Sequence, residues 1–135
     1  MENRDKKVVV IQLGKETAEF ELLWDKAPNI CEALWSRLPL ESFVTPAKVC
    51  SSEIIFMLPF MVEGENMVWP KTGDVGWWVK RASVNIWYND AGPLGPLGPT
   101  ALFGKVTKNL EGIEREAKNI WAKPGAKIVL SKKTA

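Results

Sequence analysis

Short runs of β-type residues, broken by glycine and proline, follow one another along most of this 135-residue chain. Only two segments have the periodicity of an amphipathic helix, and they lie far apart in the sequence. This order excludes a regular alternation of strands and helices. About eight short strands and two helices are typical of a closed antiparallel barrel, because closure leaves no exposed strand edge. The sequence therefore predicts a mainly β fold, a closed antiparallel β-barrel with two α-helices covering it.

The element boundaries follow from apolar alternation and from turn residues. A first helix is predicted to begin near Pro28 and to end at Pro39, and a second to begin after Asn109, a favourable N-cap. Pro46 interrupts one of the strands, which predicts an edge strand or a bent one. The predicted strands cover residues 8–13, 17–24, 44–49, 52–58, 75–79, 83–88, 101–107 and 126–130.

Length and composition predict a single domain over residues 1–135. The hydrophobic fraction is 46% and the charged fraction 25%, both ordinary for a globular chain of this size. We expect a core over residues 7–131, flexible termini over 1–6 and 132–135, and a Gly/Pro-rich loop over 89–100. The prolines of that loop exclude a helix there. The loop is either a lid over a site or simply a long connection.

Composition excludes several classes of function. The chain has no His, which removes His-dependent triads and imidazole metal ligands. Residues 1–104 carry 10 basic and 13 acidic side chains, which disfavours binding of nucleic acid. No apolar stretch is long enough for a membrane helix, and the carboxylates fit no metal-ligand pattern. We therefore expect no metal, no cofactor, no nucleic acid and no membrane.

The two cysteines, Cys31 and Cys50, form neither a CxxC pair nor a zinc pattern. Both are interpreted as reduced thiols, which favours a cytoplasmic protein. Cys31 lies on the apolar stripe of the first helix and is expected in the core. Cys50 could supply a nucleophile, but no His is present to activate it, so a buried inert thiol is the favoured interpretation.

Four stretches, in this order, carry a resemblance to a known family. They are Ala27-Pro28-Asn29-Ile30 with Leu38-Pro39; Ser51-Ser52-Glu53; Gly64-Glu65-Asn66 with Gly73-Asp74-Val75-Gly76-Trp77-Trp78; and Ile86-Trp87-Tyr88-Asn89 with Phe103-Gly104-Lys105-Val106. Together they span about residues 8–130, and the chain resembles the prokaryotic cyclophilin-like proteins. The resemblance implies an eight-stranded closed barrel with a helix over each end.

The same resemblance bears on activity. Some members of the wider superfamily form subunits of enzymes that open or hydrolyse amides and lactams, so it implies a C–N hydrolase as one expectation. Cyclophilins that isomerise prolyl bonds depend on an Arg and a Phe-x-x-Gln segment after the first helix, together with a distant Trp and a His. Residues 44–59 contain no Arg and the chain contains no His, which disfavours that activity.

Glu53 is the candidate catalytic residue. It stands at the start of an apolar strand, and a carboxylate beside an apolar wall is poorly solvated and suited to act as a general acid or base. The alternative is a strand-end carboxylate that faces water or accepts a structural hydrogen bond.

Five further residues are candidate ligand contacts: Glu65, Asn66, Trp78, Trp87 and Tyr88. An acid beside an amide on a loop can orient a polar ligand, although both residues also suit a plain turn. Consecutive Trp77 and Trp78 point to opposite faces of a strand, so only one of them can face the barrel interior. The other, with Trp87 or Tyr88, could line an aromatic pocket.

These observations favour a small-molecule-binding cyclophilin-like protein, either without catalysis or as an enzyme. In the catalytic case we expect hydrolysis of the C–N bonds of cyclic amides, with Glu53 as the general base. Two alternatives stay open. One is a non-catalytic module that binds a peptide or a partner subunit, and the other is a divergent peptidyl-prolyl isomerase. Exposed aromatic surface is also compatible with a homodimer.

Overall fold

The computed structural model describes residues 7–46, 53–89, 99–123 and 125–134. Within them the chain forms nine strands, two α-helices and one 3₁₀ turn. In chain order these are β1 (Val8–Leu13), β2 (Glu16–Leu22), α1 (Pro28–Trp35), β3 (Leu40–Pro46), β4 (Glu53–Met57), β5 (Met67–Val68), β6 (Asp74–Trp78), η2 (Val79–Arg81), β7 (Ser83–Trp87), β8 (Thr100–Lys108), α2 (Leu110–Ala122) and β9 (Ala126–Lys132).

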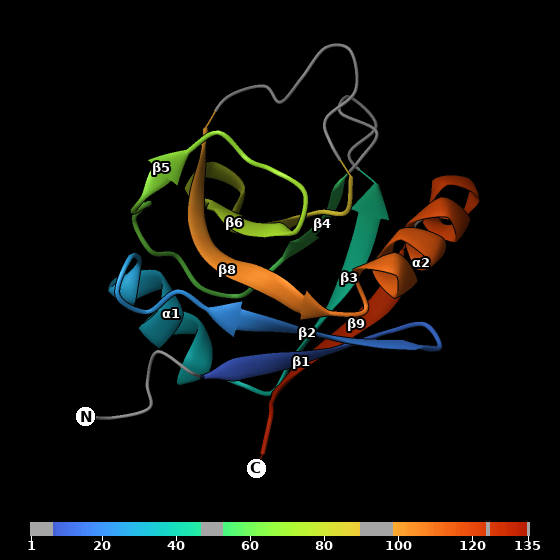
Figure 1. The fold of residues 1–135 in the computed structure, drawn as a ribbon, viewed down its shortest axis with the longest axis horizontal. Helices are drawn as coiled ribbons and strands as arrows, with labels where there is room; N and C mark the ends of the chain where they lie inside the picture. The colour runs from blue at the N-terminus through green and yellow to red at the C-terminus, as the bar shows by residue number, and fades with distance from the viewer. Residues whose placement is uncertain (1–6, 47–52, 90–98, 124, 135) are drawn as a thin grey trace.

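Eight of the strands close into an antiparallel barrel. Their order is β2-β1-β9-β3-β4-β7-β6-β8, and β8 returns to pair with β2. The ninth strand, β5, pairs with β8 and stands outside the closed ring. The predicted mainly β barrel with two helices is therefore confirmed, with one additional strand (Figure 1).

Alternate strand residues fill the barrel with apolar side chains. Phe20 and Phe103 meet edge to face, with ring centroids 6.1 Å apart. Trp77 stacks on Phe60 at 5.1 Å and donates its Nε1–H to the carbonyl of Val62. The first contact joins β2 to β8, and the second joins β6 to the segment that follows β4.

The two helices lie on opposite sides of the barrel (Figure 1). Helix α1 has a proline in its first turn, as predicted, and buries Ile30, Cys31 and Leu34. Helix α2 buries apolar side chains at positions that share one face: Ile113, Ala117 and Ile120. Within the described ranges, neither helix is long and apolar enough to span a membrane.

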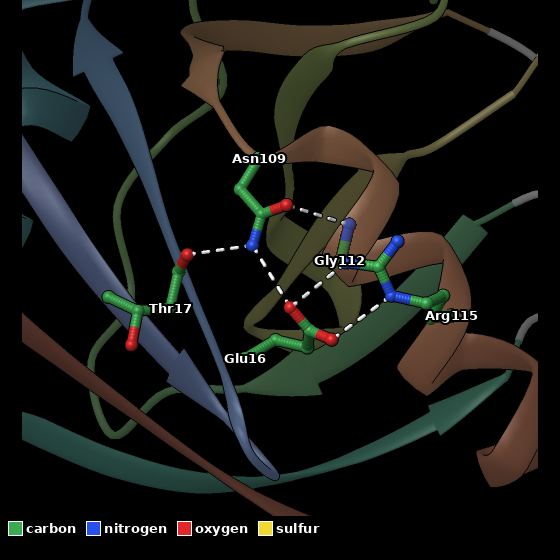
Figure 2. Close-up of polar contacts among 5 residues, drawn as sticks. All are labelled: Glu16, Thr17, Asn109, Gly112 and Arg115. Atoms are coloured by element: carbon green, nitrogen blue, oxygen red, sulfur yellow. Dashed lines mark hydrogen bonds and ion pairs between the residues drawn. The ribbon is translucent and has the colours of Figure 1, made fainter.

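The predicted N-cap of α2 joins that helix to the first hairpin. Figure 2 shows this polar group, here called the Asn109 cluster: Glu16, Thr17, Asn109, Gly112 and Arg115. Asn109 accepts a hydrogen bond from the backbone of Gly112 at 3.1 Å and donates to Glu16 Oε1 at 3.1 Å. Arg115 donates to both oxygens of Glu16, at 3.1 and 3.2 Å.

Two predicted boundaries are wrong. Strand β3 begins at Leu40 and pairs with both β9 and β4, so it is no edge strand, and Pro46 stands at its end. Helix α1 ends at Trp35, before Pro39.

The C-terminal strand also runs further than the sequence suggests. Strand β9 extends to Lys132, and the amide of Lys133 donates to the carbonyl of Val8 at 3.0 Å. The chain is thus paired beyond the point where we expect a flexible terminus. Outside the described residues lie Cys50, residues 1–6 and most of the predicted loop at 89–100.

Candidate functional site

A cavity of about 740 Å³ lies on the outer face of the barrel, over β3, β4, β6 and β7. Its wall is largely apolar, with a few polar and charged side chains, as is usual for a ligand site. The lining residues are Phe43, Thr45, Pro46, Glu53, Ile55, Phe56, Met57, Gly64, Met67, Trp77, Trp78, Val79, Lys80, Arg81, Ser83, Asn85, Trp87, Pro99 and Thr100.

Strand β7 supplies the polar floor of the cavity. Ser83, Asn85 and Trp87 alternate along it and therefore share one face, while Val84 and Ile86 belong to the core on the other. The neighbouring strands present matching positions on the same face. Glu53 of β4 stands opposite Trp87, and Trp78 of β6 stands opposite Ser83.

Glu53 and Asn85 form a buried carboxylate–carboxamide pair. Glu53 is 4% exposed, and Asn85 Nδ2 donates a hydrogen bond to its Oε2 atom. A carboxylate only accepts hydrogen bonds, so the amide nitrogen of Asn85 faces Glu53 and the amide oxygen Oδ1 points elsewhere. The pair thus fixes the orientation of Asn85 in the floor.

Three buried polar atoms of this floor have no hydrogen-bond partner in the described part of the chain. They are Ser83 Oγ, Asn85 Oδ1 and Trp87 Nε1. Buried polar atoms are nearly always paired, and each one left unpaired costs about 1–3 kcal/mol. The indole nitrogen is a donor only, the amide oxygen is an acceptor, and the hydroxyl can be either. Together they complement a ligand group that offers both N–H and C=O.

The rim of the cavity is exposed, aromatic and basic. Trp78 is 38% exposed, and the guanidinium carbon of Arg81 lies 4.9 Å from the centre of its ring. Lys80 lies beside Arg81 in the η2 turn, and both line the cavity. Phe43 and Met57 are exposed apolar members of the same rim.

The structure brings together three of the six predicted site residues: Glu53, Trp78 and Trp87 line the cavity. The prediction that only one of Trp77 and Trp78 faces the interior is confirmed, since Trp77 is 2% exposed and belongs to the core. Tyr88 also packs into the core and does not line the cavity.

Glu65 and Asn66 have structural partners and lie outside the cavity lining. Glu65 accepts hydrogen bonds from the backbone amides of Asn29 and Ile30, at 2.9 and 3.0 Å, and so stabilises the start of α1. Asn66 has a positive φ of 55° and donates to the carbonyl of Leu102 at 3.0 Å. We therefore do not include either residue in the candidate site.

Sequence reasoning missed Ser83, Asn85 and the two basic residues of η2. The signal was present in the run Ser83-Val84-Asn85-Ile86-Trp87, where polar residues alternate with apolar ones. Such alternation usually marks a solvent-exposed face, yet every residue of β7 is buried. A fully buried strand with polar residues on one face is the observation that marks the site.

Metal and thiol chemistry find no support in the residues that the structure describes. Across these ranges no three Cys, Asp or Glu side chains are grouped closely enough to hold a metal ion. Burial raises the pKa of the Cys31 thiol to about 12, so that thiol is not a nucleophile near neutral pH.

Comparison with known proteins supports the fold and gives the family, whose function is unknown. Residues 9–132 match the family described as "Protein of unknown function (DUF3830)". No curated protein matches the chain by sequence. The solved structures of similar fold include the following two. McbB, solved in complex with tryptophan, has a TM-score of 0.82 at 17% identity over 94% of this chain and 45% of McbB. The hypothetical protein AF2241 from Archaeoglobus fulgidus has a TM-score of 0.71 at 19% identity over 96% of both chains.

Proposed function

The chain belongs to the DUF3830 family of proteins of unknown function, and we propose that it binds a small molecule with a cyclic amide group in the outer cavity of its barrel. One observation carries the proposal. Three buried polar atoms on a single face of β7 have no partner among the described residues, beside the buried carboxylate of Glu53.

A cyclic amide offers the hydrogen-bond donor and acceptor that these atoms need. Its ring holds the N–H and the C=O on the same edge, so both can meet one strand face. Asn85 Oδ1 would accept from the N–H, and Trp87 Nε1 would donate to the carbonyl oxygen, with Ser83 as a further donor. The aromatic walls suit a flat ring, and about 740 Å³ is within the usual size of ligand pockets.

Hydrolysis of the bound amide is the catalytic form of this proposal. Glu53 is buried and held by Asn85, which suits a general base. It would take a proton from a water molecule whose oxygen attacks the carbonyl carbon. The C–N bond then breaks, and the proton passes to the leaving nitrogen. We also propose a place among the cyclophilin-like proteins, in which the closed barrel and two helices support the resemblance of the sequence.

A thermal-shift screen tests the proposal. The library holds cyclic amides and imides, tryptophan, which McbB binds in its solved structure, and proline-containing peptides. A ligand present at 100 times its Kd stabilises the fold by about 2.7 kcal/mol. The shift should be lost in Trp87→Phe and reduced in Glu53→Gln. It should persist in the matched controls Trp69→Phe and Glu19→Gln, whose side chains lie outside the cavity lining.

The outcomes separate the candidate functions. If the wild-type protein forms a ring-opened product from a cyclic amide and Glu53→Gln does not, the result would support hydrolysis. If the compound binds and no product forms, the result would support a binding protein without this activity. A shift by peptides alone would favour the peptide-binding or isomerase alternative. No shift by any compound would overturn the small-molecule proposal.

A further inference from the structure

The rim of the cavity extends the proposed function to a second group of the ligand. The inference rests on the proposed function. We infer that the bound molecule carries a carboxylate or similar anionic group, which Arg81 and Lys80 bind at the mouth of the cavity, formed by its rim. The ligand class is therefore a cyclic amide with an acidic substituent.

The Arg81 side chain is held in place at the mouth. Its guanidinium lies against the Trp78 ring, 4.9 Å from Cζ to the ring centre. A guanidinium that stacks on an aromatic ring keeps its N–H edge free for a planar acceptor such as a carboxylate. Lys80 and Arg81 are consecutive in the short η2 turn, which is followed by Ala82 with a positive φ of 47°.

Neither basic residue of η2 has an acidic partner in the described ranges. Elsewhere in those ranges five Lys or Arg side chains form ion pairs, among them Lys105 with Asp74 and Arg115 with Glu16. Among the described lining residues, the single acidic one is Glu53, which is 4% exposed and hydrogen-bonded to Asn85. The mouth therefore presents positive charge that no acidic side chain of the described ranges neutralises.

The polarity of the cavity fixes the orientation of such a ligand. Its floor holds the acceptors Glu53 and Asn85 Oδ1 together with the Trp87 Nε1–H donor, while its rim holds the cations of η2. A ligand with an amide at one end and a carboxylate at the other matches both ends at once. The reverse orientation would place an anion beside the Glu53 carboxylate, which is unfavourable.

Matched pairs of lactams test the inference by calorimetry. Each five- or six-membered lactam, plain or benzo-fused, is compared with the same ring bearing a carboxylate and with its methyl ester. We expect the carboxylate to bind about tenfold more tightly than the ester, equivalent to one charge-assisted contact. Arg81→Gln should remove that advantage, and Lys80→Gln should reduce it. Arg81→Lys should keep only part of the advantage of the carboxylate over the ester, because lysine lacks the planar, two-pronged set of N–H donors of a guanidinium.

Arg37→Gln is the matched control, because Arg37 also lies over an aromatic ring, that of Phe60, at 5.0 Å and outside the cavity lining. It should leave the carboxylate preference unchanged. Equal binding of carboxylate and ester by the wild-type protein would overturn the inference and leave the proposed function standing. Binding of carboxylates that survives Arg81→Gln and Lys80→Gln together would also overturn it. A panel in which nothing binds would overturn the proposed function, and the inference with it.

Discussion

Two clusters of this barrel join a carboxylate to a carboxamide from a distant part of the chain, and they differ in how completely they are paired. In the Asn109 cluster, each side-chain oxygen and nitrogen of Glu16 and Asn109 has a partner, including the charge of Arg115 (Figure 2). In the Glu53–Asn85 pair the amide oxygen of Asn85 has none among the described residues.

This difference separates a structural cluster from a candidate site. The polar atoms of Glu16 and Asn109 are hydrogen-bonded within the Asn109 cluster, and these bonds hold α2 against the turn between β1 and β2. Among the described residues, a donor, an acceptor and a hydroxyl of the cavity floor have no partner, and each such atom costs free energy. A ligand that satisfies these atoms would recover that free energy. The predictions below test whether the first cluster serves stability and the second serves binding.

The largest effect is expected from Gly112→Ala in the Asn109 cluster. A Cβ at this position would lie 2.5 Å from Glu16 Oε1 and closer still to Asn109 Nδ2. Overpacking of this kind costs about 1–3 kcal/mol, although Gly→Ala inside a helix normally stabilises. Urea unfolding should show a lower midpoint, and Asn109→Gly in the same chain should restore part of the loss by removing the crowded amide. A raised midpoint for Gly112→Ala alone would show that the cluster is not tightly packed.

Asn109 itself should contribute about 1 kcal/mol to stability, the usual value of an N-cap side chain. Its φ of 64° is left-handed, a conformation that Asn and Gly tolerate better than Ala. Thermal melts should therefore rank the wild type above Asn109→Gly and Asn109→Gly above Asn109→Ala. Equal melting temperatures for all three would contradict the structural role of the cap.

The sequence predicts those parts of the fold that carry a local signal. The hairpin at residues 8–22, Pro28 in the first turn of α1 and Asn109 before α2 each have a strong local signature, and all are confirmed. The prediction begins strand β3 too late, because Leu40–Val44 form a strand through pairing with β9, at the far end of the chain. Such a partner leaves no local pattern.

The site was less predictable, and for a related reason. The position of Glu53 at the start of an apolar strand is a local feature. Ser83 and Asn85 matter because their strand is covered on both faces, which depends on the whole barrel. The sequence predicts Glu65 as a ligand contact, because an acid beside an amide suits both a ligand site and a plain turn. Only the fold shows that its carboxylate meets the N-terminus of α1, 35 residues earlier.

Removal of a serine hydroxyl should have opposite effects in the cavity floor and at a hydroxyl that already has a hydrogen-bond partner. Ser83 Oγ is buried with no partner in the part of the chain that the structure describes, so Ser83→Ala should leave stability unchanged or raise it by up to about 1 kcal/mol. The matched control is Ser42→Ala on β3, whose hydroxyl donates to the carbonyl of Met57 at 2.5 Å. Its loss should cost about 1 kcal/mol. Urea midpoints of both variants check the pair, and in the ligand screen only Ser83→Ala should weaken binding. A clear loss of stability in Ser83→Ala would show that its hydroxyl is already satisfied.

The smallest expected effect is a pH dependence confined to the Asn109 cluster. The hydrogen bonds from Arg115 and Asn109 hold the pKa of Glu16 below its ordinary value of 4.5. The folded protein therefore binds this proton less tightly than the unfolded chain does, and the contribution of Glu16 to stability is complete above pH 4.5. It is lost as the pH falls through the lowered pKa, where the carboxylate takes up its proton. Melting temperatures of the wild type and of Glu16→Gln should differ at pH 7 and converge below pH 4.5, while Arg115 stays charged throughout. A gap that is constant from pH 7 to pH 3 would mean that the charge of Glu16 contributes nothing, and that Asn109 alone holds α2 to the hairpin.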